Sequence, residues 1–298
     1  MLKEPVGFIT MAFGAQRYLD QADALARSLR RHMPGHPICL VTDQVRMTDL
    51  YDTQIGIERL DMPGTLLKTM LYDYSPYAET LFIDSDCIAV RPFHDHIAAM
   101  QNWDFTPVCD TYLKRGDQDL WLEDVGAALD KLGGEVFPKY NGGVYFFRKS
   151  PHAAEVFSRA RLLLERQQEL GILDFDKAGP GEETLIGLAL VEMGATDLYN
   201  DAAGLMRTPL NSTGEIEIDP IRGRSHFMKE GRDVSPAIVH FCGDYAAHPT
   251  YTIARRMLER GAPLKPLEGK AIHAGWKFDK LRARVRGKLQ SMGRPALS

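Results

Sequence analysis

The chain has 298 residues, of which 44% are apolar and 26% charged, and its formal net charge is −4. This length suits one large α/β domain or two small ones with a full hydrophobic core. The slightly acidic balance gives no reason to expect nucleic acid as a partner, and no apolar run reaches the length of a membrane-spanning helix.

The cysteines and the first residues indicate the cellular compartment. Cys39, Cys87, Cys109 and Cys242 form no Cys-x-x-Cys pair, so a disulfide framework is not expected. The first 14 residues carry an acidic residue within a short mixed apolar run, and we interpret them as a strand, not as a signal peptide. We therefore expect a cytoplasmic protein.

The first half of the chain alternates short apolar runs with amphipathic segments. The apolar runs predict strands at 6–10, 38–42, 56–60 and 80–83, of which the third is the weakest. The amphipathic segments predict helices at 18–32 and 68–74. Strands that alternate with helices indicate an α/β fold with a mostly parallel central sheet and helices on both faces.

The second half is less regular. Its apolar and amphipathic segments predict strands at 105–108, 144–147 and 237–241 and helices at 152–170 and 182–193. Residues 200–235 are rich in Gly, Pro, Asp and Arg and predict a loop excursion. Because no repeat or low-complexity linker divides the chain, we expect one domain over residues 1–262, followed by a tail at 263–298.

The clearest chemical signal is Phe-Ile-Asp-Ser-Asp-Cys at residues 82–87. Alternation along an extended chain places Asp84 and Asp86 on one side and Ser85 on the other. Open α/β sheets bind ligands at the carboxyl ends of their strands, and two acids placed there repel each other unless a cation lies between them. A solvated turn uses the same residue types, but the position directly after an apolar strand favours a metal site.

A histidine stands near the end of the last predicted strand, in Ala-Ile-Val-His-Phe. His240 is either a hydrogen-bonded core residue or, if it converges on the two aspartates, a third metal ligand. An Asp/Asp/His set suits Mn²⁺ better than Mg²⁺, because imidazole is a softer ligand than a carboxylate.

Two further segments carry candidate residues. Asn141 is followed by Gly142 and Gly143, and paired glycines permit either a left-handed turn or a close approach of the backbone to a ligand. Glu182 and Glu183 lie in the first turn of a predicted helix, where acidic side chains interact favourably with the helix dipole. Each pattern is also compatible with an ordinary structural role.

Taken in order, these segments resemble the retaining glycosyltransferases of the GT-A fold, specifically family 8, which includes glycogenin and bacterial lipopolysaccharide galactosyl- and glucosyltransferases. The resemblance spans residues 6–250. It rests on FITMAFGAQRYLDQADALARSL, Lys68, LFIDSDCIAV, NGGVYFFRKSP, EETLIGLAL, PLN at 209–211 and VHFCG.

The resemblance implies a site for a nucleotide-sugar donor, usually a UDP-sugar in this family. Asp84, Asp86 and His240 would bind a divalent metal, Mn²⁺ or Mg²⁺. Asp86, Asn141 and Glu183 would act at the catalytic centre, where Asn141 lines the acceptor side and Glu183 contacts the donor sugar. The residues implied in donor binding are Ile9, Thr10, Ala12, Tyr18, Lys68, Asp84, Ser85, Gly142, Gly243 and His248.

The chain departs from the family pattern at three points. The family's Asp-Gln-Asp motif reads Gly181-Glu182-Glu183. The lysine that grips the diphosphate in the family is Ala246 in register, and His248 is the nearest substitute. Asp244 adds a negative charge close to the expected phosphates. Because of these departures, the alternative that the protein binds a nucleotide sugar or a glycan without transferring it stays open.

The implied reaction transfers a sugar to an acceptor hydroxyl with retention of configuration, and the acceptor is a glycan or a lipid-linked glycan. Phosphatases of the haloacid dehalogenase type compete with this interpretation, since they also place Asp-x-Asp after an apolar strand and have a late Gly-Asp motif. Here, however, the motif strand comes fourth and not first, and the Asn-Gly-Gly segment has no role in such an enzyme.

The tail is strongly basic, with seven Lys/Arg and one acidic residue in 276–298. Its apolar residues recur at helical spacing, at Phe278, Leu281, Val285, Leu289 and Met292. The pattern predicts either a helix on an anionic membrane surface or a helix packed on its own acidic domain. The basic, membrane-associating tails of bacterial family 8 enzymes favour the first, and hence a peripheral position on the inner face of the membrane.

Overall fold

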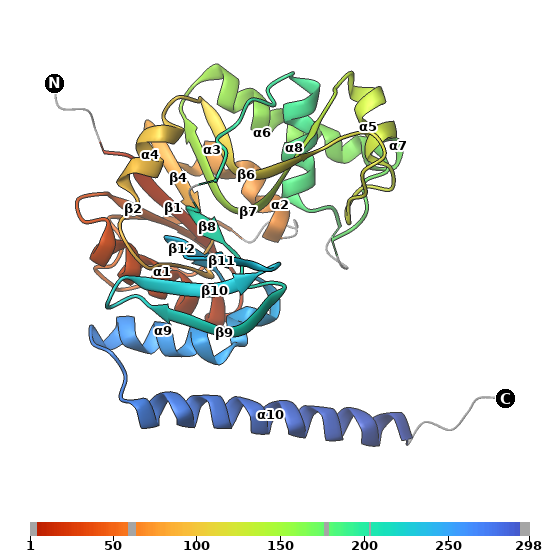
Figure 1. Ribbon diagram of the computed structural model, residues 1–298. Helices are drawn as coiled ribbons and strands as arrows, with labels where there is room; N and C mark the ends of the chain where they lie inside the picture. The colour runs from red at the N-terminus through yellow and green to blue at the C-terminus, as the bar shows by residue number, and fades with distance from the viewer. Residues whose placement is uncertain (1–4, 59–63, 176–178, 203, 293–298) are drawn as a thin grey trace.

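The computed structural model describes residues 5–58, 64–175, 179–202 and 204–292, without the side chains of 64–65 and 283–292. Its centre is a sheet with helices on both faces (Figure 1). The described strands of this main sheet lie in the order β3-β2-β1-β4-β7-β6. Their bounds are β1 Gly7–Ala12, β2 Ile38–Thr42, β3 Thr53–Gly56, β4 Glu79–Ile83, β6 Phe105–Leu113 and β7 Phe137–Arg148.

The strand directions confirm the predicted α/β fold. β1 is parallel to β2 and to β4, and β2 is parallel to β3, whereas β7 is antiparallel to both β4 and β6. After β1 the chain builds β2 and β3 on one side and then crosses to β4 on the other. The strand order therefore reverses between β1 and β4, and open α/β sheets bind ligands at the carboxyl ends of the strands flanking such a reversal.

Helices cover the sheet and extend beyond it. Their bounds are α1 Gln16–His32, α2 Gly64–Leu67, α3 Leu71–Tyr74, α4 His94–Met100, α5 Val125–Leu132, α6 Pro151–Leu163, α7 Gln167–Leu170, α8 Glu182–Glu192, α9 Pro249–Arg260 and α10 Pro266–Met292. Short 3₁₀ turns lie at Lys68–Met70, Leu164–Arg166 and Gly243–Ala247. The turn at Leu164–Arg166 divides the predicted helix 152–170 into α6 and α7.

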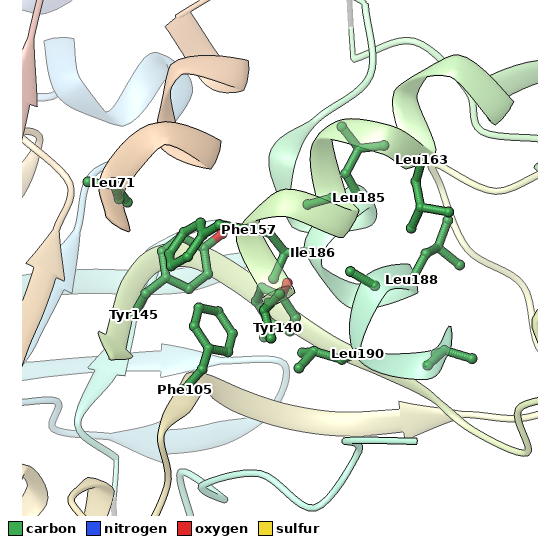
Figure 2. Packing of buried hydrophobic residues seen from close by; sticks show 14 of the residues in the cluster. Leu71, Phe105, Tyr140, Tyr145, Phe157, Leu163, Leu185, Ile186, Leu188 and Leu190 are labelled. Atoms are coloured by element: carbon green, nitrogen blue, oxygen red, sulfur yellow. The ribbon is translucent and has the colours of Figure 1, made fainter. Parts of the chain in front are cut away.

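Alternate side chains of the main sheet enter two separate hydrophobic clusters. On one face Tyr145 stacks on Phe82 of β4, and Phe105 packs against Phe157 of α6 with ring centroids 5.3 Å apart (Figure 2). This cluster also contains α5 and α8. On the other face Leu81 and Phe146 pack with α1 and α4. The sheet is thus buried on both sides.

The prediction of a loop excursion over 200–235 was wrong, because the segment forms strands. The additional strands are β5 Cys87–Ala89, β8 Met206–Arg207, β9 Ser212–Asp219, β10 Arg224–Lys229, β11 Arg232–Val234 and β12 Ile238–His240. β9, β10 and β11 form one small sheet, and β5, β12 and β8 form another. Most of β9 is exposed and only its end is buried, so its sequence carries little apolar alternation.

Other predicted elements differ mainly in their bounds. The third strand is Thr53–Gly56 and not 56–60, whose last two residues lie outside the described residues. β6 and β7 extend well beyond the predicted 105–108 and 144–147. β7 runs straight through Asn141-Gly142-Gly143, and neither glycine has a positive φ, so these glycines do not form a left-handed turn.

The tail forms α10, which begins ten residues before the predicted basic segment and contacts α9 (Figure 1). Phe278 and Leu281 are exposed, while the side chains of Val285, Leu289 and Met292 lie outside the description. Throughout the described residues, the helices lack the combination of length and apolar character that crossing a bilayer demands.

Candidate active site

Backbone pairing brings the two aspartates and the histidine together. Asp84 directly follows β4, and its N–H donates to the Gly143 carbonyl of β7 at 2.9 Å. Asp86 directly precedes β5, which pairs antiparallel with β12 so that Cys87 lies opposite His240. The end of β4, the middle of β7 and the end of β12 therefore meet beside the reversal of strand order.

The three side chains converge, which is the condition under which the sequence makes His240 a candidate third ligand. His240 Nε2 lies 2.9 Å from Asp86 Oδ1 and 3.7 Å from Asp84 Oδ2. Asp86 Oδ1 is buried, and no hydrogen bond from the described residues satisfies it. A buried carboxylate oxygen is costly unless a donor or a cation satisfies it. This unsatisfied oxygen fits a bound metal ion.

Asn141 determines which nitrogen of His240 is free. The Asn141 Oδ1 atom accepts from the Gly143 N–H at 3.1 Å and lies 2.5 Å from His240 Nδ1. Because a backbone N–H only donates, the atom facing it is the amide oxygen, and the Nδ1 that meets the same oxygen carries a proton. Neutral His240 then has its lone pair on Nε2, towards the aspartates, as metal coordination requires.

Two glycines of β7 make room for these side chains. A Cβ on Gly143 would lie 2.5 Å from His240 Nδ1, and a Cβ on Gly142 would lie 2.6 Å from Glu182 Oε1. Any larger residue would displace the imidazole or the carboxylate. The paired glycines therefore permit a close approach of the backbone, but to the side chains of His240 and Glu182 and not to a ligand.

Lys68 lies among carboxylates and is buried with them. Its Nζ donates to Asp84 Oδ2 and to Glu182 Oε1, both at 2.7 Å, and to the Gly142 carbonyl at 3.3 Å. Burial alone lowers the pKa of Lys68, but Asp84 and Glu182 outweigh it and the net shift is upward. The ammonium therefore stays charged and neutralises part of the acidic cluster.

Glu182 belongs to this cluster of charged side chains, which the helix-dipole interpretation did not indicate. It is 3% exposed, and its side chain reaches Lys68 instead of solvent. Burial raises the pKa of Glu182 to about 7, with Glu183 and Asp84 acting in the same direction and Lys68 opposing them. The signal that could have revealed it is its place between Gly181 and Glu183, in register with the middle of the Asp-Gln-Asp motif.

Glu183 holds the backbone of β7 and so confirms that α8 and β7 meet at this point. The Gly142 N–H donates to Glu183 Oε1 at 2.7 Å, and the Tyr140 hydroxyl donates to the Glu183 carbonyl at 2.9 Å. The two acidic residues of α8 therefore form one wall of the cluster that contains Lys68 and Asp84.

The positions of the side chains make Cys87 an alternative metal ligand. Its thiol, an Asp86 oxygen and a His240 nitrogen lie within 4.8 Å of one another. Burial raises the pKa of the Cys87 thiol, and Asp86 and Asp84 raise it further. A neutral thiol is a poor ligand for Mn²⁺ or Mg²⁺, which prefer carboxylate and imidazole. The chemistry of this donor set therefore disfavours Cys87 as a ligand for these ions.

The strand residues implied in donor binding are largely buried. Ile9, Thr10 and Ala12 lie in β1 with buried side chains, and Thr10 Oγ1 has no hydrogen-bond partner among the described residues. Ser85 is buried as well, and its N–H donates to Asp84 Oδ1 at 2.9 Å. Tyr18 is exposed near the start of α1, where its hydroxyl accepts from Arg17.

The last two implied donor residues follow β12. Gly243 has a φ of +60° at the start of a 3₁₀ turn. His248 caps α9, since its Nδ1 accepts from the Thr250 N–H at 3.3 Å, and its ring packs against Trp276 of α10 with centroids 5.0 Å apart. The structure thus connects this segment to the tail helix.

No protein-family model matches the chain, and no curated protein matches it. Among solved structures, the apo structure of the WbbM bifunctional glycosyltransferase is 11% identical with a TM-score of 0.52, over 88% of this chain and 52% of that one. The chain has the GT-A glycosyltransferase fold. In this GT-A fold, the predicted metal residues lie where the strand order reverses.

Two other solved glycosyltransferase structures are similar to this chain but superpose on it less closely. The galactosyltransferase LgtC, in complex with donor and acceptor sugar analogues, is 16% identical with a TM-score of 0.49, over 90% of this chain and 100% of that one. The glycosyltransferase GlyE of Streptococcus pneumoniae TIGR4 is 16% identical with a TM-score of 0.39, over 66% and 45%. The chain thus spans about half the length of WbbM and of GlyE.

Proposed function

We propose that this chain is a metal-dependent glycosyltransferase that moves a sugar from a nucleotide-sugar donor, of the UDP class, to an acceptor hydroxyl with retention of configuration. The GT-A fold supports the reaction class. The observation that carries the proposal is the convergence of Asp84, Asp86 and His240 beside the strand reversal, with one buried Asp86 oxygen unsatisfied by the described residues.

Asp84, Asp86 and His240 would hold Mn²⁺ or Mg²⁺, and the imidazole favours Mn²⁺. The bound ion would supply Lewis-acid stabilisation of the diphosphate leaving group. Asn141 keeps the proton of His240 on Nδ1, and Gly143 leaves space for the imidazole. These two residues of β7 thus orient the third ligand.

Of the remaining polar residues, one would interact with the phosphates of the donor and two with its sugar. Lys68 places a buried positive charge beside Asp84, where it stabilises anionic groups of the donor. Glu182 and Glu183 form the acidic wall on the other side, where they accept hydrogen bonds from donor-sugar hydroxyls. The acceptor hydroxyl attacks from the face that the diphosphate leaves, and we assign no enzymic nucleophile.

Turnover of nucleotide sugars tests this proposal. We expect release of nucleoside diphosphate from one of UDP-glucose, UDP-galactose or GDP-mannose only with Mn²⁺ or Mg²⁺, and loss of this turnover in Asp86→Asn. Asp95→Asn, an exposed acid of α4, is the matched control. Wild-type turnover in Asp86→Asn would contradict the proposal, and phosphatase activity without any nucleotide sugar would favour the haloacid dehalogenase alternative.

A non-catalytic nucleotide-sugar or glycan-binding protein is the second candidate. One observation favours it: Ala246 occupies the register of the family's lysine, and His248 packs against Trp276. Tight donor binding with neither transfer nor hydrolysis would support this candidate.

We also propose that α10 attaches the protein to an anionic membrane surface, where a lipid-linked glycan would be the acceptor. Phe278 and Leu281 are exposed beside Lys280 and Arg282, and this mixture of apolar and basic side chains suits the lipid interface. The contact of Trp276 with His248 attaches the first half of α10 to the catalytic domain.

A further inference from the structure

Two loops near the start of α8 present apolar side chains to solvent. Leu120 is 77% exposed, Leu173 38% and Phe175 43%, and Trp121 is partly exposed. The rings of Trp121 and Phe175 touch, with centroids 4.9 Å apart and planes inclined by 59°. We call Trp121, Leu173 and Phe175 the aromatic platform. Contiguous exposed apolar patches of this kind mark sites for ligands or partners.

Backbone pairing holds the platform in place. Leu122 and Ile172 form an antiparallel bridge, and the Leu173 N–H donates to the Trp121 carbonyl at 3.0 Å. Successive side chains of extended segments face opposite sides, so Leu122 and Ile172 are buried in the core while Trp121 and Leu173 face outward. The fold therefore preorganises the aromatic rings.

On one side the platform adjoins the acidic wall of the proposed active site. Phe175 packs against Gly181, where a Cβ would lie 3.7 Å from the Phe175 Cβ. Gly181 is the residue that precedes Glu182, whose carboxylate contacts Lys68. Phe175 therefore contacts the residue that directly precedes Glu182 in the chain, and Glu182 belongs to the cluster around Asp84.

On the other side the platform is connected to β7. The Trp121 N–H donates to Asp119 Oδ1 at 2.8 Å, and Asp119 Oδ2 forms an ion pair with Lys139 at 2.5 Å. The side chain of Asp119 is almost fully buried in this contact. Lys139 lies two residues before Asn141 in β7, so the platform is fixed relative to the strand that carries the site.

We propose that the aromatic platform is an acceptor subsite that stacks a sugar ring, which makes the acceptor a saccharide; this rests on the proposed glycosyltransferase function. A pyranose ring presents a face of C–H groups with hydroxyls at its rim. The apolar, electron-rich face of an aromatic ring complements the C–H groups. Glu123, exposed and two residues after Trp121, supplies acceptors for hydroxyls, and its charge disfavours an anionic lipid surface.

Saccharide binding to the full chain tests the proposal, with lactose, maltose, cellobiose and N,N′-diacetylchitobiose as probes. Saturation-transfer NMR and affinity titration compare the wild type with the Trp121→Ala/Phe175→Ala double variant. Trp121→Phe retains a ring for stacking. Leu162→Ala removes an exposed leucine of α6 that lies outside the platform and is the matched control. The thermal shift caused by nucleotide and Mn²⁺ is recorded for every variant.

The platform predicts binding of at least one saccharide, weakened about tenfold in the double variant and retained in Trp121→Phe and Leu162→Ala. No saccharide binding in the wild type, or equal affinity in the double variant, would overturn it. Binding of phosphatidylserine vesicles that the double variant loses, without saccharide binding, would assign the platform to lipid instead. Platform-dependent saccharide binding without any nucleotide shift in the wild type would leave the subsite standing and refute the proposed function.

Discussion

Asn141 contacts His240, and that contact determines which imidazole nitrogen faces the aspartates. The resemblance implied that Asn141 lines the acceptor and donor sugar. The structure adds a positioning role, because the amide oxygen is shared between the Gly143 N–H and His240 Nδ1. Outer-shell hydrogen bonds of this kind orient metal-bound histidines.

We expect Asn141→Ala to weaken Mn²⁺ binding roughly 10- to 100-fold, since an unanchored imidazole can rotate or protonate on Nε2. Titration of Mn²⁺ followed by the electron paramagnetic resonance of the free ion measures this directly. Asn102→Ala, an exposed asparagine after α4, should bind Mn²⁺ like the wild type. Equal affinity in Asn141→Ala and Asn102→Ala would refute the positioning role.

Glu182 makes the stability of the metal-free protein depend on pH, and the direction of this dependence follows from its raised pKa. Its pKa is raised from 4.5 to about 7, so between these values the folded chain binds a proton that the unfolded chain has lost. The stability contributed by this group is fully present below pH 4.5 and is lost as the pH rises through 7. Glu182→Gln keeps an acceptor for Lys68 but cannot titrate.

Urea unfolding in EDTA between pH 5 and pH 8 tests this expectation. The free energy of unfolding should fall less with pH in Glu182→Gln than in the wild type, by ~3 kcal/mol at most across the window. Glu165→Gln, an exposed glutamate, serves as the control. Parallel pH profiles for the wild type and Glu182→Gln would mean that Glu182 titrates normally.

At the residue scale, sequence patterns predicted that the two aspartates and His240 form a metal site, whereas they gave Glu182 only a helix-dipole role. Asp84 and Asp86 stand out because two acids at the carboxyl end of a strand repel each other unless a cation lies between them, whereas an acid in a first helical turn is ordinary. Only the packing of α8 against β7 shows that Glu182 faces inward. That packing depends on contacts between residues far apart in the chain, which no local pattern contains.

At the scale of elements, β7 is the strand that builds the site. It pairs with β4 and β6, and its glycines lie behind His240 and Glu182. The sequence predicted only residues 144–147 as strand, because Asn-Gly-Gly normally ends a strand. The strand continues because β7 pairs with β6 on both sides of the glycines, and the glycines leave room for the neighbouring side chains of the site.

Gly143→Ala tests the role of β7. A methyl group 2.5 Å from His240 Nδ1 must displace the imidazole, so we expect a loss of about 1–3 kcal/mol in the unfolding free energy of the metal-free protein and weaker Mn²⁺ binding. Gly275→Ala, in α10 with nothing within 4 Å, should leave Mn²⁺ binding unchanged. Wild-type Mn²⁺ affinity in Gly143→Ala would show that the close approach is not needed.

For the molecule as a whole, the order of strands and helices predicted the α/β class correctly. The alternation of apolar strands and amphipathic helices in the first half is a strong local signal. The small sheets of the second half were missed, since β9 is mostly exposed and β8 and β12 are short. Their pairing with β5, and hence the position of His240, is a long-range property of the fold.

The tail helix adds a prediction at this scale. A chain that ends at Pro266 should lose binding to phosphatidylserine vesicles, because the exposed apolar and basic side chains of α10 are removed. Co-sedimentation with vesicles measures this, and Lys280→Glu/Arg282→Glu in the full chain should weaken binding in the same direction. Unchanged vesicle binding after truncation would place the tail in a purely structural role on α9.

The most direct test of the metal-dependent donor site is a thermal-shift titration with UDP, UDP-glucose, UDP-galactose, GDP and GDP-mannose, each with and without Mn²⁺. A ligand that binds only the folded state raises the Tm with its affinity and concentration. We expect one nucleotide class to raise the Tm only when Mn²⁺ is present, and this shift to vanish in Asp84→Asn. No shift with any nucleotide, or an equal shift in Asp84→Asn, would contradict the proposed donor site.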